Sequence, residues 1–359
     1  MSEPLPALLP RFVLGTGRCG STLLSRMLAE NERVLNIFEF FSGIDEFFRF
    51  RRDPVAGPEL ASRLRQDHPM LTMVLERGAR VPEVVYPFGA PGMRYARGDA
   101  IPWILGIAIA RLSPEPDALF EALLGEAESL PARPLAQHYA HLFSWLVRRC
   151  GKELWIERSG SSIGTLGTLA EFFPGARFVH LHRDGREAAI SMREYTVLRV
   201  AVAVMNGMLG DVEYSHEGLE ELERRQPEAI DRLIATHPPI ELFGRYWSGQ
   251  IEEGYAALRR LDPGAFIELR FEDLLADPRR ELGRIADFLE IGGGDWIARA
   301  AALVDREPPA RFATLPPDEQ RRLEAACRPA MDLLGRKLRK LQRSNVPEVA
   351  SGRRGSGGG

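Results

Sequence analysis

Short, mostly apolar runs alternate with longer segments of helical periodicity along most of the chain. Such runs are typical of strands buried on both faces of a parallel sheet, and the alternation predicts an α/β fold. The expected strands are Arg11–Leu14, Val34–Phe38, Leu154–Ile156, Arg177–Leu181 and Ala265–Leu269. The expected helices are Ser21–Glu30, Leu135–Arg149, Ser162–Phe173, Gly185–Tyr195, Glu241–Arg260, Arg279–Leu289 and Asp318–Leu341.

Two segments interrupt this alternation. Residues 45–133 are helical and punctuated by prolines, and residues 196–240 contain an apolar run followed by an acidic helix. Insertions in α/β proteins often lie over the carboxyl ends of strands, where ligands bind, and peripheral bulk is the equally weighted alternative. We expect one domain over residues 1–345 that carries both insertions, and a Gly/Ser-rich disordered tail over 346–359.

The first expected strand runs into a glycine-rich turn, GTGRCGST, at residues 15–22. Glycines let a backbone approach an anion closely, and the amides at the start of the following helix point toward it. Arg18 adds a positive charge, and Ser21 and Thr22 add hydroxyl donors. The turn therefore predicts a phosphate-binding loop, with a turn that merely starts a helix as the alternative.

This loop differs from the triphosphate-binding loop GxxxxGK[ST]. Gly15 and Gly20 have the required spacing, but Ser21 stands where the lysine would be. We also find no expected strand that ends in the aspartate with which kinases and NTPases hold Mg²⁺. The loop indicates an adenosine 5′-phosphate bound without a metal, and a metal-dependent phosphotransferase or kinase is the disfavoured alternative.

A second anion-binding pattern follows the strand that ends near residue 181. Arg183 comes directly after it and can form a forked contact with a phosphate. Ser191 lies eight residues further on, two turns into a helix, and could reach the same anion if that helix passes over it. The nearby HxHxD pattern at 180–184 is better explained by strand alternation than by a zinc site.

Together, the two patterns resemble the sulfotransferases that use 3′-phosphoadenosine 5′-phosphosulfate (PAPS) as donor. A third match is the segment FIELRFEDLLADPRRELGRIADFLEI at 266–291. The resemblance covers residues 11–41, 153–195 and 241–340. It implies a P-loop-like three-layer α/β/α fold with a central parallel sheet, and metal-independent sulfuryl transfer to a hydroxyl or amine. It also implies that the following residues bind the donor: Arg18, Cys19, Gly20, Ser21 and Thr22 at the 5′-phosphosulfate, and Arg183 and Ser191 at the 3′-phosphate.

The resemblance implies that Glu39, just past the second strand, is the general base that takes the proton of the acceptor. The phenylalanines on either side of Glu39 lead us to expect its carboxylate among aromatic rings, and a capping or surface glutamate is the alternative. Asp45 and Glu46 are fallback bases.

Three further positions take their roles from the same resemblance. Arg158 would lie near the transferred sulfuryl group, Phe271 would stack on adenine where relatives have tyrosine, and Arg311 would replace a lysine that reaches the donor. A surface position for Arg158 and core packing for Phe271 are the alternatives. Cys19 near a helix N-terminus could have a lowered pKa and be oxidisable, or could simply be a small filler.

Composition adds little that changes this picture. The chain has 359 residues and a formal net charge of −3, which gives no reason to expect nucleic acid as a partner. Three scattered cysteines favour a reducing compartment, and no signal peptide or run long enough to span a bilayer is visible. We expect a cytoplasmic enzyme whose acceptor is a small molecule, glycan or lipid. A non-catalytic nucleotide-binding protein of the same fold is the remaining alternative, and the oligomeric state is not predicted.

Overall fold

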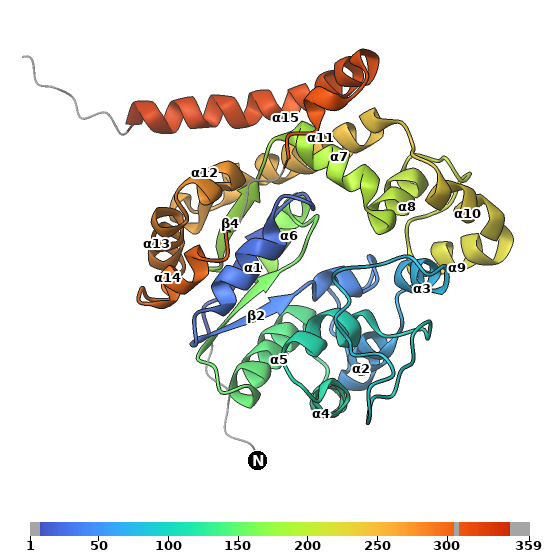
Figure 1. The fold of residues 1–359 in the computed structure, drawn as a ribbon. Coiled ribbons are helices and arrows are strands. Elements are labelled where there is room, and N and C mark those ends of the chain that lie inside the picture. Colours follow the sequence, from blue (N-terminus) through green and yellow to red (C-terminus); the bar gives the residue numbers. More distant parts are fainter. Residues whose placement is uncertain (1–7, 305–308, 345–359) are drawn as a thin grey trace, which may run out of the picture.

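The computed structural model describes residues 8–304 and 309–344. At its centre is a five-stranded parallel sheet of order β2-β3-β1-β4-β5 (Figure 1). The strands are β1 Arg11–Leu14, β2 Val34–Phe38, β3 Leu154–Arg158, β4 Arg177–His182 and β5 Phe266–Arg270. All five expected strands are confirmed, and β3 and β4 run on to Arg158 and His182.

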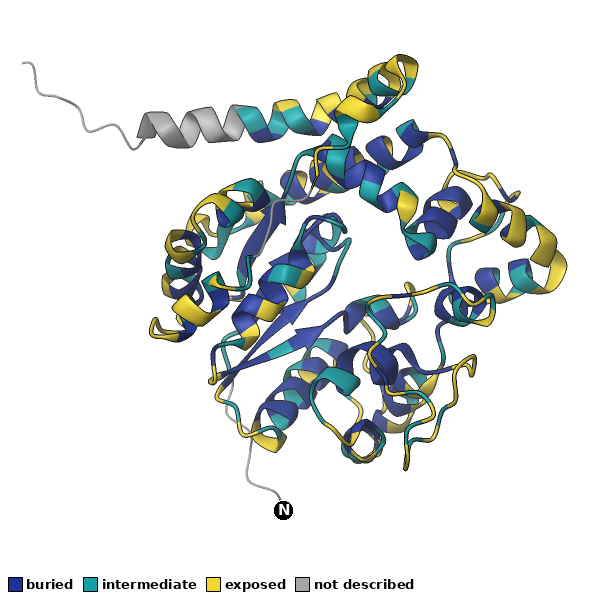
Figure 2. Ribbon diagram, viewed as in Figure 1, coloured by how far each residue is buried: buried dark blue, intermediate teal, exposed yellow. Residues whose placement is uncertain are grey.

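Apolar clusters on both faces of the sheet make the fold three layers deep. Successive residues of β1 alternate, so that Phe12 faces one cluster and Val13 the other. Helices cover both faces, and their sides toward the sheet are buried (Figure 2). The helices of the Val13 side are α1 Ser21–Ala29, α12 Phe271–Ala276, α13 Pro278–Leu289 and α14 Trp296–Ala301. Those of the Phe12 side include α5 Leu135–Arg149, α6 Leu166–Phe172, α7 Gly185–Glu194 and α11 Ile240–Ala257.

The expected helices form with small changes at their ends. The helix expected over Ser162–Phe173 begins with a 3₁₀ turn, Ile163–Thr165, before α6, and α11 ends in another, Leu258–Arg260. The last helix, α15, covers Pro317–Ser344. None of the described helices has the length and apolar character needed to cross a membrane. The tail expected to be disordered, 346–359, lies outside the described residues.

The two inserted segments are helical and face each other. The first contains α2 Gly57–Arg65, α3 Pro69–Glu76, the π-helical Ile104–Ala108 and α4 Pro116–Glu128. The second contains α8 Thr196–Met205, α9 His216–Arg225 and α10 Pro227–Ala235. Helix α3 packs against both α8 and α9, so the insertions meet beyond the sheet (Figure 1).

Candidate active site

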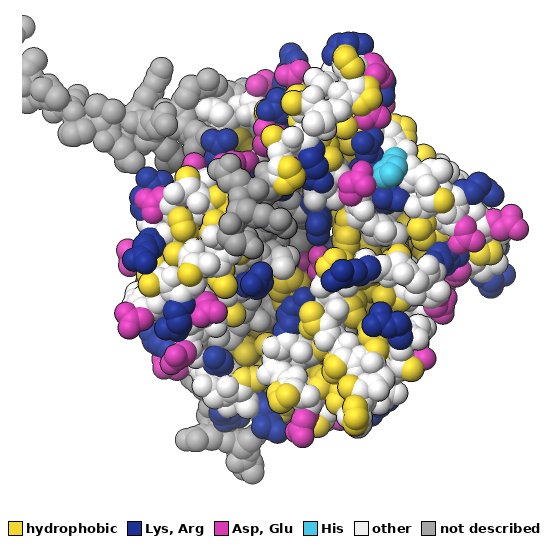
Figure 3. All heavy atoms as spheres, viewed as in Figure 1, with side chains coloured by type: hydrophobic (Ala, Val, Ile, Leu, Met, Phe, Trp, Pro, Cys, Tyr) yellow, Lys and Arg dark blue, Asp and Glu magenta, His cyan; other side chains and the backbone are white. Residues whose placement is uncertain are grey.

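A cavity of about 540 Å³ lies where the carboxyl ends of four strands meet the two insertions. Its floor comes from the residues that follow β1, β2, β3 and β4, which include Gly17, Glu39, Gly160 and Arg183. This is the edge at which ligands bind in open parallel sheets. Figure 3 shows Lys and Arg side chains beside apolar ones in the middle of the face of the molecule that it presents.

The turn after β1 has the backbone of an anion-binding loop. Gly17 and Gly20 have φ angles of 79° and 92°, and Arg18 between them has 51°. A β-carbon on Gly20 would lie 2.1 Å from the ring of Phe271, so only glycine fits there. The amides of Ser21 and Thr22 open α1, where a helix offers no acceptor to its own N–H groups. Ser21 and Thr22 both line the cavity, and Thr22 is exposed.

Gly20→Ala is expected to lower the free energy of unfolding by about 2–4 kcal/mol, because both the positive φ and the displaced Phe271 ring are unfavourable. Urea denaturation measures this change. Gly125→Ala is the matched control, since Gly125 lies within α4 and a β-carbon there meets nothing within 4 Å. It should stabilise by about 0.5–1 kcal/mol. Equal effects of the two substitutions would contradict the packing of Phe271 on the loop.

Cys19 is fully buried beneath this loop. Burial raises the pKa of its thiol, which contradicts the alternative of a lowered pKa and easy oxidation and agrees with the alternative of a small filler. The sulfur fills the space under Gly15, where a β-carbon would lie 2.5 Å from it. The side chain of Cys19 is therefore a small filler, and only its backbone belongs to the loop surface.

Arg18 joins the two anion-binding patterns. Its Nε donates a hydrogen bond to the Ser191 hydroxyl at 3.2 Å, and its Nη1 lies 3.3 Å from Glu83 Oε1. The Tyr195 hydroxyl donates to the other oxygen of Glu83 at 2.7 Å, and the Arg18 guanidinium lies 4.9 Å from the centre of the Tyr195 ring. The guanidinium of Arg18 therefore connects the glycine-rich loop with helix α7, which carries Ser191.

Arg183 lines the same cavity and has no ion pair within residues 8–304 and 309–335. Its Nε is buried without a hydrogen-bond partner there, and burial lowers the pKa of the guanidinium. The guanidinium lies 5.5 Å from the centre of the Phe271 ring. Phe271 itself is 5% exposed and belongs to the apolar cluster on the Val13 side of the sheet. Arg183 is therefore a partly desolvated cation that is available to an anion.

Glu39 follows β2 and is 8% exposed. Its carboxylate forms an ion pair with Arg158 and accepts hydrogen bonds from the Ser42 hydroxyl at 2.6 Å and the Gly160 amide at 2.8 Å. The expectation of an aromatic environment for this carboxylate is wrong, because its surroundings are polar. Glu39 is also held through its backbone, since its carbonyl accepts the Trp103 indole N–H at 2.9 Å.

Arg158 ends β3 and is 2% exposed, which rules out the alternative of a surface arginine. Its guanidinium lies 3.6 Å from the centre of the Phe38 ring, and Arg111 lies 4.0 Å from the same centre. Burial and the charge of Arg158 lower the pKa of Arg111 to about 10. The Nη2 of Arg158 is buried without a partner in the described part of the chain. The floor of the cavity therefore has unused donors beside Glu39.

The remaining predicted residues lie elsewhere or are engaged. Asp45 accepts the amides of Phe47 and Phe48 at 3.1 and 3.2 Å and so serves as a turn cap. Glu46 lines the cavity and pairs with Arg49 at 2.6 Å. Arg311 donates its amide to Glu187 in α7 at 2.8 Å and is not among the residues that line the cavity.

Several residues of the site were not predicted. Glu83 comes from the first insertion, and no strand end or glycine turn marks it in the sequence. Ser42 and Gly160 hold Glu39, and only the position of Gly160 just after a strand could have indicated a role. His180 and His182 are buried in β4, and His180 contacts the Tyr255 hydroxyl at 3.2 Å. Within the described residues, no group of three or more His, Cys, Asp or Glu side chains could hold a metal ion.

Comparison with known proteins identifies relatives. A family model described as "Sulfotransferase family" matches residues 10–243 and 232–293, and no curated protein sequence matches. One similar solved structure is the sulfotransferase domain of the olefin synthase of Synechococcus PCC 7002, with 17% identity, coverage of 91% of each chain and a TM-score of 0.40. Another is sulfotransferase STF9 from Mycobacterium avium, with 17% identity, coverage of 91% of this chain and 77% of that one, and a TM-score of 0.44.

Proposed function

The chain belongs to the sulfotransferase family, and from this premise we propose that it transfers a sulfuryl group from PAPS to a hydroxyl or amine of its acceptor. Glu39 acts as the general base, and Arg18 to Thr22, Arg183 and Ser191 bind the donor. The acceptor is a small molecule, a glycan or a lipid.

In this reaction the acceptor oxygen attacks the sulfur in line with the bond that breaks. A new O–S bond forms, the S–O bond to the 5′-phosphate breaks, and 3′,5′-ADP leaves. Glu39 takes the proton from the acceptor hydroxyl. Arg18, Arg158 and the amides that open α1 stabilise the charge on the sulfuryl group and the leaving phosphate, as fixed donors do in other group transfers.

One observation carries the proposal: the two anion-binding patterns and Glu39 open onto one cavity, and Arg18 is hydrogen-bonded to Ser191 across it. The cationic groups also fit two separate anions. The Nε of Arg183 and the Nη2 of Arg158 are both buried without a partner in the described ranges. A donor that carries anionic groups at both its 5′ and 3′ ends would satisfy both positions.

Thermal unfolding with added nucleotides tests the donor site. We expect 3′,5′-ADP at 100 times its Kd to stabilise the protein by about 2.7 kcal/mol over the protein without nucleotide. AMP, or ATP with Mg²⁺, should stabilise it less at the same concentration. Arg183→Ala should abolish the advantage of 3′,5′-ADP over AMP. Arg270→Ala is the matched control, because Arg270 is the last residue of the neighbouring strand β5 but is exposed and pairs with Glu272. Stabilisation by ATP with Mg²⁺ alone would instead support a phosphotransferase.

A further inference from the structure

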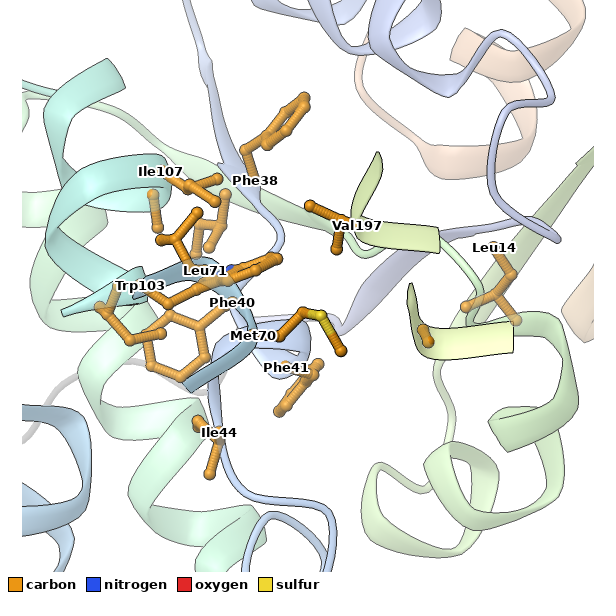
Figure 4. Close-up of a cluster of buried hydrophobic side chains, with 14 of the residues drawn as sticks. Leu14, Phe38, Phe40, Phe41, Ile44, Met70, Leu71, Trp103, Ile107 and Val197 are labelled. Atoms are coloured by element: carbon orange, nitrogen blue, oxygen red, sulfur yellow. The ribbon is translucent and has the colours of Figure 1, made fainter. Parts of the chain in front are cut away.

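Away from Glu39 the cavity continues between the two insertions, where apolar side chains line it together with polar ones such as Glu46 and Arg49. Met70 comes from the first insertion, and Val197, Ala201 and Leu219 come from the second. Trp103 also lines the cavity and donates its indole N–H to the carbonyl of Glu39. Figure 4 shows Trp103, Met70 and Val197 in the apolar cluster to which they belong.

Two histidines line this part of the cavity, one from each insertion. His68 precedes α3 and His216 opens α9, and their ring centres lie 4.6 Å apart. The ring of His68 also lies 5.0 Å from that of Trp103. The contacts therefore run from Glu39 through Trp103 to His68 and then to His216, so the indole connects the backbone of Glu39 with the imidazole pair.

Both imidazoles have unused hydrogen-bonding capacity. His68 is 7% exposed, and its Nδ1 and the Nε2 of His216 are buried without partners in the described part of the chain. Buried polar atoms are normally satisfied, and leaving one unsatisfied is unfavourable. Arg49, another polar residue of the wall, is already paired with Glu46. The Nε of Arg49 is also buried without a partner, so among the described wall residues of the insertions the histidines are the uncharged groups with unsatisfied polar atoms.

The histidines are neutral in the folded protein. Burial lowers the pKa of His68 to about 3, and it also lowers the pKa of His216. A neutral imidazole offers one N–H donor and one acceptor nitrogen, which matches a hydroxyl group in either direction. A cationic acceptor group would gain no ion pair from these rings, and an anionic one would have to compete with Glu46 for Arg49.

Resting on the proposed function, we propose that the acceptor is a neutral, largely apolar molecule with a second hydroxyl group, remote from the hydroxyl that is sulfated. His68 and His216 bind this second hydroxyl, while Glu39 faces the first. The two insertions thus determine acceptor choice by supplying one histidine each, and the Trp103 indole sets the spacing between the two hydroxyls.

Two phenols of nearly the same size and shape test this assignment. 4,4′-Biphenol has a distal hydroxyl and 4-phenylphenol lacks it. Calorimetric titration of the protein, with and without saturating 3′,5′-ADP, should show biphenol binding about tenfold more tightly. Biphenol can bind in two equivalent orientations, which by itself doubles its affinity, and the expected tenfold preference exceeds this factor of two. In His68→Phe/His216→Phe, which keeps flat rings in place, the preference should fall to that factor of two.

The controls separate this inference from the proposed function. His141→Phe should keep the tenfold preference, because His141 lies on α5 and pairs with Glu126 instead. If the double variant does not fold, His216→Phe alone, at the more exposed ring, should still reduce the preference. Equal affinity of the two phenols for the wild type, binding of neither, or an unchanged preference in the folded variant would overturn the inference. Absence of 3′,5′-ADP binding would count against the proposed function, and the titration without nucleotide would still measure the preference.

Discussion

Glu39→Gln is expected to lower kcat by about 10²- to 10⁴-fold and to leave the affinity for 3′,5′-ADP unchanged. The glutamine carbonyl oxygen can still accept hydrogen bonds from the Ser42 hydroxyl and the Gly160 amide, which both reach Oε2, whereas the pair of Oε1 with Arg158 is lost. The amide cannot take a proton. Steady-state rates with any acceptor that the wild type sulfates, together with calorimetric titration of 3′,5′-ADP, measure both quantities.

Glu83→Gln is the matched control for this prediction. Glu83 is a second carboxylate of the same cavity, but its two oxygens are engaged by Arg18 and Tyr195. Burial raises the pKa of the Tyr195 hydroxyl, so this residue stays a neutral donor to Glu83. We expect kcat to fall by less than about tenfold, the size of an ordinary hydrogen-bond effect. A large loss in Glu83→Gln together with near-normal turnover in Glu39→Gln would assign the base to Glu83.

The backbone at Glu39 supports a specialised role for this position. Its φ is 54°, and Arg18 and Ser161, which also line the cavity, have φ angles of 51° and 50°. Residues other than glycine rarely adopt this conformation, and each instance costs on the order of 1–3 kcal/mol. The Glu39 amide donates to the Arg158 carbonyl at 2.7 Å, which helps to hold the strained residue. Such strain concentrates at sites where side-chain direction matters.

The sequence was sufficient to predict the strands and the residues at their ends, because both signals are local. A buried parallel strand is a short apolar run, and the residue after it is found by counting. Glu39 and Arg158 stand at the ends of two such runs, and their roles were implied by the resemblance to the sulfotransferases. Their ion pair was not predicted, since it depends on the pairing of Phe38 in β2 with Arg158 in β3. That register is set by packing between segments more than a hundred residues apart, which no local pattern reports.

One wrong expectation, one rejected alternative and one omission have the same origin. The phenylalanines next to Glu39 are its neighbours in sequence, but successive residues at a strand end point in different directions, so Phe40 joins the core while the carboxylate meets Arg158. Cys19 is likewise near a helix N-terminus in sequence but faces the core under Gly15. His68 and His216 lie in separate insertions, and only the contact between α3 and α9 brings them together.

Arg18→Lys is expected to lower kcat/KM for PAPS by about 10²- to 10³-fold, although the positive charge is kept. The guanidinium reaches Ser191 through Nε and Glu83 through Nη1 at the same time, and a lysine has a single nitrogen for both. Arg26→Lys is the matched control, because Arg26 lies on α1 after the same loop, is exposed, and does not line the cavity. Its kcat/KM should stay within about twofold, as is usual for exposed substitutions.

The distribution of the Arg18→Lys effect tests what the arginine does. A residue that stabilises only the transition state lowers kcat, whereas one that binds donor and transition state equally raises KM. In the folded protein Arg18 already has an anionic partner in Glu83, so a bound phosphosulfate must compete with that carboxylate for the guanidinium. This competition weakens ground-state binding, and we therefore expect most of the loss in kcat and a change of less than about tenfold in the affinity for 3′,5′-ADP. A loss confined to KM would instead make Arg18 a donor-binding residue without a special role in the chemical step.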